Sequence, residues 1–220
     1  MTLTSNRYFP IFVDISEMKV LVVGGGKVGS KRALKFREFN SQVTVISLEF
    51  TDELMMKEDI EKIKGEANSL NDEFISKFDI IVTATNNREV NSRLCERAKQ
   101  LRKLCNNPTN PSQSSFIVPI FYESEDLGIA VTTLGKSSIM SKVILDRVLE
   151  LINRDPKILF EVKVMGEVKN LLKAKVNDPS LRYVLYQKIF VDKQFETYVN
   201  DGNVNSAMKR AEEIINESSS

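Results

Sequence analysis

Three glycines, Gly24, Gly26 and Gly29, have the spacing of a turn that binds the phosphates of a nucleotide. Residues 19–23 before them are typical of a buried parallel strand, and residues 28–39 after them are typical of a helix. In such a unit the first glycine permits a tight turn, the second lets a pyrophosphate approach the backbone, and the third lets helix and strand pack closely. The positive dipole end of the helix then faces the phosphates. The spacing therefore predicts a dinucleotide site, with a purely structural glycine turn as the alternative.

Two further strand ends are expected beside this turn, because the carboxyl ends of parallel strands share one edge of a sheet. Residues 42–47 form the second predicted strand and residues 79–85 the fourth. An Asp or Glu at the second strand end would bind a ribose 2′-hydroxyl, but Glu49 is displaced, so Ser47 or backbone groups are expected there. No Lys or Arg follows this strand, which favours NAD over NADP. The candidate cofactor-binding residues are Gly24, Gly25, Gly26, Lys27, Val28, Gly29, Ser47, Leu48, Glu49, Thr83, Ala84, Thr85 and Asn86.

The composition excludes several other kinds of chemistry. Histidine is absent from the 220 residues, which rules out Ser-His-Asp and Cys-His nucleophiles and imidazole metal ligands. The net charge of +1 gives no reason to expect a nucleic-acid partner. No apolar run reaches the roughly 18 residues that cross a bilayer, and no signal-peptide core is visible, so we expect a cytoplasmic protein without membrane contact. Cys95 and Cys105 do not make a zinc site, and we expect neither a metal site nor a disulfide.

The order of predicted elements is that of an α/β protein, with a doubly wound parallel sheet followed in the chain by a β-hairpin and a helical region. Residues 8–15 are expected to form an edge strand, 60–64 and 103–106 short strands, and 116–121 with 128–133 a β-hairpin. Asn86 or Asn87 is alternatively the N-cap of the helix that follows. From residue 139 onward the chain is predicted to be helical, with an apolar stripe at Leu159, Val162, Met165, Val168, Leu172 and Val176.

Two polar segments are further candidates for binding. Residues 107–115 contain two prolines and no apolar residue, and they leave the carboxyl end of a predicted strand. We expect this loop to hang over the nicotinamide end of the cleft. Residues 134–138 combine a glycine, a lysine and two serines at the start of a predicted helix, with Ser137 or Ser138 as its N-cap. The segment is a second candidate anion site, and a simple helix cap is the alternative.

Several segments, in this order and spacing, resemble the precorrin-2 dehydrogenase family, the N-terminal part of siroheme synthases. They are Phe9-Pro10-Ile11-Phe12, residues 23–33 with the glycine turn, residues 83–91, Cys105-Asn106 followed by residues 115–119, and residues 128–137. The resemblance implies oxidation of precorrin-2 to sirohydrochlorin with NAD and, in some members, insertion of ferrous iron. It also implies an intertwined homodimer with a Rossmann-type NAD-binding domain (1–113), a small β dimerisation region (114–153) and a C-terminal helical domain (154–220).

One position of the loop departs from the family. Members with both activities carry an aspartate there that is implicated in catalysis, and ungapped alignment of the flanking segments places Thr109 at it. A hydroxyl is not a base near neutral pH, so we expect a dehydrogenase whose chelatase activity is weak or absent, with Thr109 as the candidate catalytic position. A non-catalytic tetrapyrrole- or nucleotide-binding partner of the same fold is the alternative. The candidate substrate-binding residues, for the carboxylate arms of precorrin-2, are Asn107, Ser114, Lys136, Ser137 and Lys142.

Overall fold

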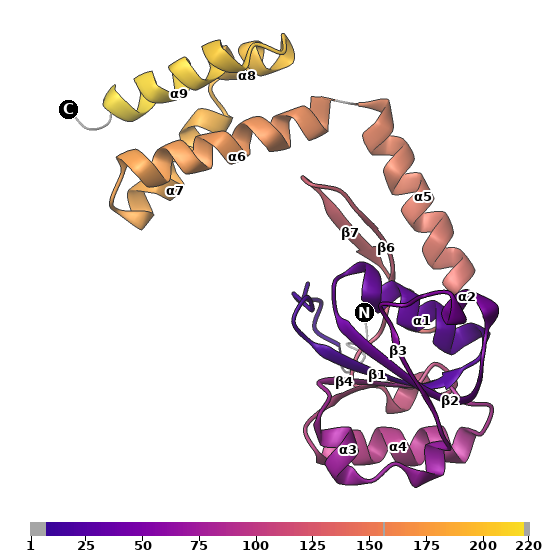
Figure 1. The fold of residues 1–220 in the computed structure, drawn as a ribbon. Helices are drawn as coiled ribbons and strands as arrows, with labels where there is room; N and C mark the ends of the chain where they lie inside the picture. The colour runs from indigo at the N-terminus through magenta and orange to yellow at the C-terminus, as the bar shows by residue number, and fades with distance from the viewer. Residues whose placement is uncertain (1–7, 156, 218–220) are drawn as a thin grey trace, which may run out of the picture. The chain divides into compact units, whose positions relative to one another are not determined.

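The computed structural model describes residues 8–155 and 157–217 of the chain. They form two compact units, which divide between Val118 and Pro119. In Figure 1 the N-terminal unit is a sheet between helices, and the C-terminal unit contains a β-hairpin and the later helices. The three-part division at residues 113 and 153 stays a prediction.

A five-stranded parallel sheet forms the centre of the N-terminal unit. Its strands, in order across the sheet, are β3 (Glu61–Lys64), β2 (Gln42–Phe50), β1 (Lys19–Gly25), β4 (Ile80–Thr83) and β5 (Leu104–Asn106). β1 and β4 are almost continuous buried runs, as expected of parallel strands that are covered on both faces. The strand order reverses between β1 and β4, and in such sheets a ligand crevice forms at the carboxyl ends of the strands on either side.

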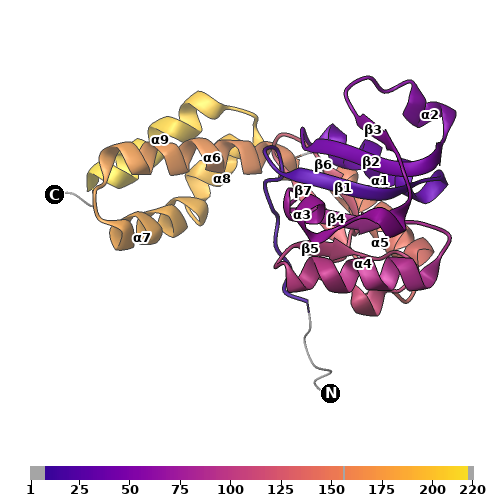
Figure 2. The same ribbon diagram turned by 60° about the horizontal axis from the view of Figure 1, so that its bottom comes forward.

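Helices cover both faces of this sheet, which Figure 2 shows from a second direction. On one face α1 (Lys27–Glu38) and α2 (Asp52–Met55) bury an apolar cluster against β1, β2 and β4. On the other face α3 (Asp72–Ser76) and α4 (Arg88–Gln100) bury a second cluster. Two short 3-10 helices, η1 (Ala67–Ser69) and η2 (Pro111–Gln113), complete the unit. The predicted doubly wound α/β sheet is confirmed.

The C-terminal unit begins with an antiparallel hairpin of β6 (Ile120–Glu123) and β7 (Gly128–Val131), on which α5 (Ser138–Arg154) packs. The expected first hairpin strand is shorter than predicted, because Pro119 has no N–H group to donate. One apolar core then joins α6 (Lys157–Lys175), α7 (Pro179–Phe190), α8 (Lys193–Asn200) and α9 (Val204–Glu217). Within the described residues, no helix has the length and apolar character needed to cross a bilayer.

The apolar stripe expected on α6 is correct at its C-terminal end and wrong at one position. Met165, Val168, Leu172 and Val176 are buried in the helical core. Val162 is 41% exposed, and Val164 is buried instead. This helix has apolar residues on more than one side. The 3.6-residue periodicity therefore does not decide whether Val162 or Val164 faces the core.

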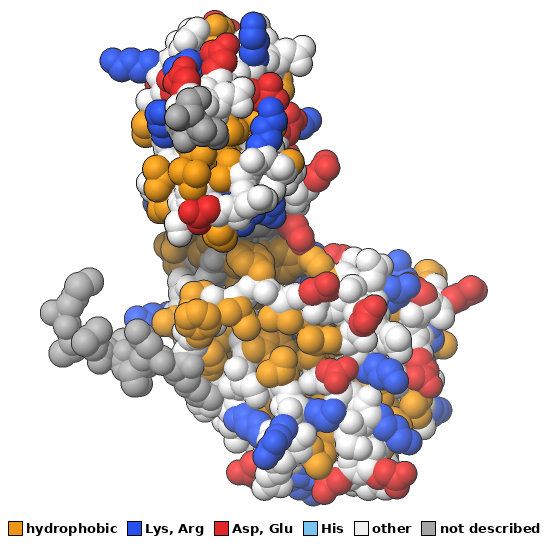
Figure 3. All heavy atoms as spheres, turned by 90° about the vertical axis from the view of Figure 1, so that its left-hand side faces the viewer, with side chains coloured by type: hydrophobic (Ala, Val, Ile, Leu, Met, Phe, Trp, Pro, Cys, Tyr) orange, Lys and Arg blue, Asp and Glu red, His pale blue; other side chains and the backbone are white. Residues whose placement is uncertain are grey.

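The edge strand expected at residues 8–15 is wrong. The segment has no regular secondary structure, and Phe9 and Phe12 are 84% and 77% exposed. Its end is anchored where the Ser41 hydroxyl donates to the Ile15 carbonyl at 2.9 Å. In Figure 3 the N-terminal unit is the lower part of the picture, and hydrophobic side chains gather on the face that it shows. The residue types of the segment favour a β-strand locally, but Pro10 has no N–H group to donate and so limits pairing with a sheet.

The expectation that the cysteines are not disulfide-bonded is also wrong. Cys95 of α4 and Cys105 of β5 form a disulfide, with their Cα atoms 5.5 Å apart. Both side chains are fully buried. The packing of α4 on β5 brings the two sulfur atoms together, and the bridge joins α4 to the strand that leads into residues 107–115.

An ion pair joins the start of α8 to α9. Arg210 donates to the two carboxylate oxygens of Asp192, from Nε at 3.2 Å and from Nη2 at 2.9 Å. Asp192 also accepts from the Phe195 N–H at 2.8 Å as the N-cap of α8. The hydrogen bonds from Arg210, opposed in part by burial, lower the pKa of Asp192. A carboxylate with a lowered pKa stabilises the folded state above its unfolded pKa of about 3.9, and this contribution is lost as the pH falls through the folded value.

We expect Asp192→Asn to keep the helix cap, because Asn caps as well as Asp, and to lose the ion pair with Arg210. Its unfolding midpoint near neutral pH should fall by roughly 3 °C, and its stability should depend less on pH below about pH 4 than that of the wild type. Thermal unfolding followed by circular dichroism, once near neutral pH and once below about pH 4, measures both effects. Asp146→Asn, which removes the exposed pair with Lys142, is the control and should change little. An unchanged pH dependence in Asp192→Asn would contradict this assignment.

Candidate functional site

The glycine turn combines tightly packed glycines with one that faces open space. Gly24 has φ +114°, and a Cβ atom there would lie 2.5 Å from the Ala84 carbonyl oxygen at the end of β4. A Cβ atom on Gly29 would lie 1.8 Å from the Gly24 carbonyl oxygen. Gly26 has an ordinary φ of −74°, and no atom lies within 4 Å of its Cβ position. Because Gly26 is also the N-cap of α1, the open space lies where a phosphate would meet the helix dipole.

Hydrogen bonds from α1 and the residue after β2 hold the carbonyl group of Gly25. The Ser30 hydroxyl donates to this carbonyl at 3.0 Å, and the Thr51 N–H donates to it at 3.2 Å. The two hydroxyl groups of Ser30 and Thr51 are 2.8 Å apart and bond to each other. Neither residue is among the candidates predicted from the sequence, although Ser30 directly follows the last glycine of the turn. They fix the turn between β1 and α1 independently of any ligand.

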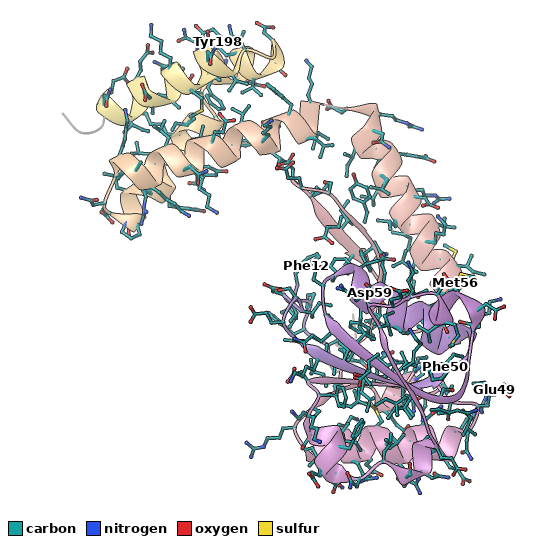
Figure 4. The ribbon with its side chains drawn as sticks, in the orientation of Figure 1. Phe12, Glu49, Phe50, Met56, Asp59 and Tyr198 are labelled. Carbon is teal, nitrogen blue, oxygen red and sulfur yellow. A yellow bond between two sulfur atoms is a disulfide. The ribbon has the colours of Figure 1, made fainter. Side chains whose placement is uncertain are left out.

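The end of β2 lies against the glycine turn. A Cβ atom on Gly25 would lie 3.0 Å from the Ser47 Cβ and 2.4 Å from the Glu49 carbonyl oxygen. The side chain of Glu49 points away from the body of the unit (Figure 4). The sequence shows no cation after β2, but the sheet register pairs Ser47 with Lys64 of β3. A lysine therefore stands beside this strand end, and it comes from the neighbouring strand.

The end of β4 is held by a buried side chain, that of Asn91, which is not among the candidates predicted from the sequence. The Asn91 side chain accepts from the Thr85 N–H at 3.1 Å and hydroxyl at 2.6 Å, and it donates to the Thr85 carbonyl at 2.9 Å. The Thr83 hydroxyl is buried and finds no partner within the described residues. Asn87 is the N-cap of α4, with its side chain bonded to two N–H groups, and Asn86 makes no such cap bond within the described residues. The cap alternative therefore belongs to Asn87.

Asn91 also connects the β4 end to the loop of residues 107–115. Its Nδ2 atom donates to the Thr109 hydroxyl at 3.4 Å, and that hydroxyl donates to Oδ1 of Asn107 at 2.7 Å. Asn107 is fully buried, and its N–H donates to the Ser114 hydroxyl at 2.9 Å. The structure thus brings together Asn107, Thr109 and Ser114, all of which the sequence selected. Asn107 and Ser114 bond to one another, and Thr109 offers a hydroxyl that is already engaged.

The remaining candidate residues for the substrate lie in the C-terminal unit. Ser137 is the N-cap of α5, and its hydroxyl accepts from the Met140 N–H at 3.2 Å. Lys142 pairs with Asp146 at 2.8 Å on the surface of α5. Lys136 is exposed in the turn that precedes the helix. The N-cap alternative is therefore realised by Ser137, and Lys136 is the cation of this segment that has no ion-pair partner within the described residues.

The first turns of α1 carry positive charge. Lys27 and Val28 are exposed beside the open position of Gly26. Arg32 is half-buried and makes no hydrogen bond or ion pair within the described part of the chain, and burial lowers the pKa of its guanidinium group. At the β2 end, Leu48 offers an exposed apolar side chain. This combination suits an anionic ligand that also has an apolar ring.

Charged side chains also line a cavity of about 480 Å³ at the other edge of the sheet, at the amino ends of β1 and β2. Arg37 and Asp59, the second of which is labelled in Figure 4, pair there at 2.7 Å. Lys19, Lys77 and Glu61 are further lining residues, so that both signs of charge are present. Among residues 8–155 and 157–217, no group of three or more Cys, Asp or Glu side chains is placed to hold a metal ion.

Comparison with known proteins places this geometry in context. Residues 11–120 match a family model described as putative NAD(P)-binding. A putative precorrin-2 dehydrogenase from Methanocaldococcus jannaschii is 30% identical over 194 residues, which cover 84% of this chain and 91% of the relative. A siroheme synthase from Blochmanniella pennsylvanica is 27% identical over 96% of this chain, and the match spans 44% of that relative. The chain thus spans less than half the length of the siroheme synthases that it matches.

A solved structure gives an independent comparison of the fold. The chain is similar to "SirC, precorrin-2 dehydrogenase", with a TM-score of 0.65 and 20% sequence identity, over 94% of this chain and 100% of that one. The match supports the α/β sheet with its hairpin and later helices. None of the names of these relatives favours the alternative of a non-catalytic partner protein.

Gly26→Asp and Gly29→Ala should separate dinucleotide binding from stability. Asp at residue 26 enters open space at an N-cap, so we expect an unchanged unfolding midpoint, but its carboxylate should repel phosphate and weaken NADH binding at least about a hundredfold. Ala at residue 29 must displace backbone and should cost roughly 1–3 kcal/mol of stability. Circular dichroism and NADH fluorescence titration measure the two effects. Unchanged NADH affinity in a folded Gly26→Asp protein would contradict the site.

Proposed function

The chain belongs to the family of precorrin-2 dehydrogenases and siroheme synthases, and we propose that it oxidises precorrin-2 to sirohydrochlorin with NAD as the hydride acceptor. The observation that carries this proposal is the open position of Gly26 at the start of α1, between glycines whose Cβ positions are filled by backbone. Such an arrangement serves no packing purpose, because any residue fits at this φ angle, but it admits a pyrophosphate.

The residues of the N-terminal unit fit a dinucleotide along the carboxyl edge of the sheet. We assign the pyrophosphate to residues 24–29, the adenosine end to residues 47–49, and the nicotinamide end to residues 83–86. NAD held by these residues would supply the hydride acceptor. The chain itself holds the cofactor and the substrate carbon in position, which is the main contribution of a protein to hydride transfer.

The tetrapyrrole substrate requires positive charge, because precorrin-2 has eight carboxylate arms. Within the C-terminal unit we assign this role to Lys136 and Lys142, with Ser137 as a hydrogen-bonding group. Asn107 and Ser114 belong to the N-terminal unit, where both are buried and bonded to one another, and their role in substrate binding stays a prediction. Lys142 already has a carboxylate partner in Asp146, so a substrate carboxylate would have to compete for it. Lys136 has no such partner within the described residues and is the stronger candidate.

Thr109 stands where the resemblance implies an aspartate, and its surroundings bear on the second activity of the family. Its hydroxyl donates to Asn107 Oδ1 at 2.7 Å, so it is held as a hydrogen-bond donor and is no base near neutral pH. The proton that leaves with the hydride can pass to water. Metal insertion must remove pyrrole protons, and we therefore propose that chelatase activity is weak or absent.

The C-terminal unit supports a homodimer. The hairpin of β6 and β7 has two outer strand edges that pair with no other strand within the described residues. Ile139 and Leu151 on α5 are 76% and 63% exposed. We propose that a second copy of the chain covers this region. We also propose that the protein works in the cytoplasm, because burial of both cysteines shields the disulfide from the reductants of that compartment.

Purified protein incubated with precorrin-2 and NAD should form NADH and sirohydrochlorin in equal amounts. Absorbance of NADH and the spectrum of sirohydrochlorin measure both products, and Gly26→Asp is the inactive control. Addition of ferrous or cobalt ions should give metal insertion no faster than in a protein-free control. Tight tetrapyrrole binding without NADH formation would contradict the dehydrogenase, and insertion above the spontaneous rate would contradict only the statement on chelatase activity.

The variant with Ile139→Glu and Leu151→Glu should be a folded monomer, because two carboxylates cannot be buried in an apolar interface. Sedimentation velocity gives the mass of the particle, and we expect about twice the chain mass for the wild type. Met56→Glu, on an exposed residue of the N-terminal unit that is labelled in Figure 4, is the control and should stay dimeric. A monomeric wild type at micromolar concentration would overturn the proposal.

A further inference from the structure

The end of β2 in this protein has the chemistry of a phosphate site. We propose that it accepts the 2′-phosphate of NADP, so that the protein binds NADP as well as NAD, and that Lys64 determines the ratio of the two affinities. The inference rests on the dinucleotide site proposed above and names a further specificity-determining residue in it. It follows from the sheet register, the contacts of Ser47 and the direction of the nearby carboxylate.

The register places Lys64 and Ser47 on the same side of the sheet. β2 pairs with β3 in parallel from Thr44 opposite Glu61 to Ser47 opposite Lys64. Side chains of residues paired in this way project from the same face, and the strands lie about 5 Å apart. Val45, two residues before Ser47, is buried with α1 and α2, so this face is the one from which α1 begins.

Ser47 lies between Lys64 and the glycine turn. On one side its Cβ atom is 3.0 Å from the Cβ position of Gly25, and on the other its carbonyl accepts from the Gly65 N–H at 3.1 Å. Its hydroxyl makes no hydrogen bond within the described residues. A ribose bound beside Ser47, three residues before β2 ends at Phe50, would therefore meet a free hydroxyl and, on the neighbouring strand β3, an ammonium group.

The carboxylate that would exclude a phosphate is missing from this position. Glu49 points away from the body of the unit in Figure 4, and Glu61 accepts a hydrogen bond from Thr44 at 2.7 Å. Lys62 is bound to backbone carbonyls, of Ile60 at 3.0 Å and of Lys57. Lys64 is exposed and makes no hydrogen bond or ion pair within the described residues. Its ammonium group is thus available to a ligand.

The two groups together select the ligand by charge and by hydrogen bonding. A carboxylate at this point binds a 2′-hydroxyl and repels a 2′-phosphate, whereas a cation accommodates the phosphate. A serine hydroxyl can donate to either oxygen, which keeps NAD as a ligand. The ammonium group adds a charge-assisted bond that only NADP can use.

Fluorescence titration of the full chain with NADH and with NADPH tests the inference without precorrin-2. The dissociation constants of the wild type should differ by less than about tenfold. Lys64→Gln should weaken NADPH binding by about tenfold and Lys64→Glu by more, while NADH binding changes by less than about threefold. Lys99→Gln, on an exposed lysine of α4 across the sheet, is the matched control and should change neither constant.

The outcomes separate this inference from the proposed function. NADPH binding that is more than about a hundredfold weaker than NADH binding would overturn it, as would equal NADPH affinities in Lys64→Glu and the wild type. Either result leaves the NAD-dependent oxidation in place. Failure of the wild type to bind NADH as well as NADPH would instead overturn the dinucleotide site itself.

Discussion

The close approach of α1 to the sheet is the constraint on which the rest of the N-terminal unit depends. Gly29 brings the helix against the Gly24 carbonyl, and Gly24 brings β1 against the Ala84 carbonyl of β4, at distances that leave no room for a Cβ atom. Because these contacts join the two strands at which the sheet order reverses, they place the start of α1 directly above the crevice. Gly26 is the gap that remains, and it is where we propose that the pyrophosphate binds.

The parts of the site that the sequence predicts are those set by short-range geometry. The glycine turn and the cap at Ser137 each depend on neighbours within a few residues, and both are as expected. The position of Lys64 beside Ser47 and the bond between Cys95 and Cys105 depend on strand register and on helix packing across the chain. A one-dimensional pattern contains neither. The prediction of a strand at residues 8–15 rests on their apolar composition alone. Composition favours strand pairing, but it does not provide the neighbouring strand that pairing requires.

Buried polar side chains connect separate segments of the N-terminal unit beside the proposed cofactor site. Asn91 bonds to Thr85 at the end of β4 and to Thr109 in the loop, and Asn107 orients Thr109 from the other side. The disulfide fixes the strand from which this loop starts. The end of β4 and the loop that contains Thr109 are therefore one connected structure. Thr109, at the position where the resemblance implies an aspartate, forms a hydrogen bond within this loop.

The most direct test of the central claim is to map where NAD touches the protein. In a titration of ¹⁵N-labelled protein with NAD, we expect the largest amide shifts at residues 25–29, followed by residues 47–49 and 83–86. The amides around the cavity at the amino edge of the sheet, near Arg37 and Lys77, should stay unchanged. Shifts confined to that cavity, or no shifts at the glycine turn at saturating NAD, would contradict the account.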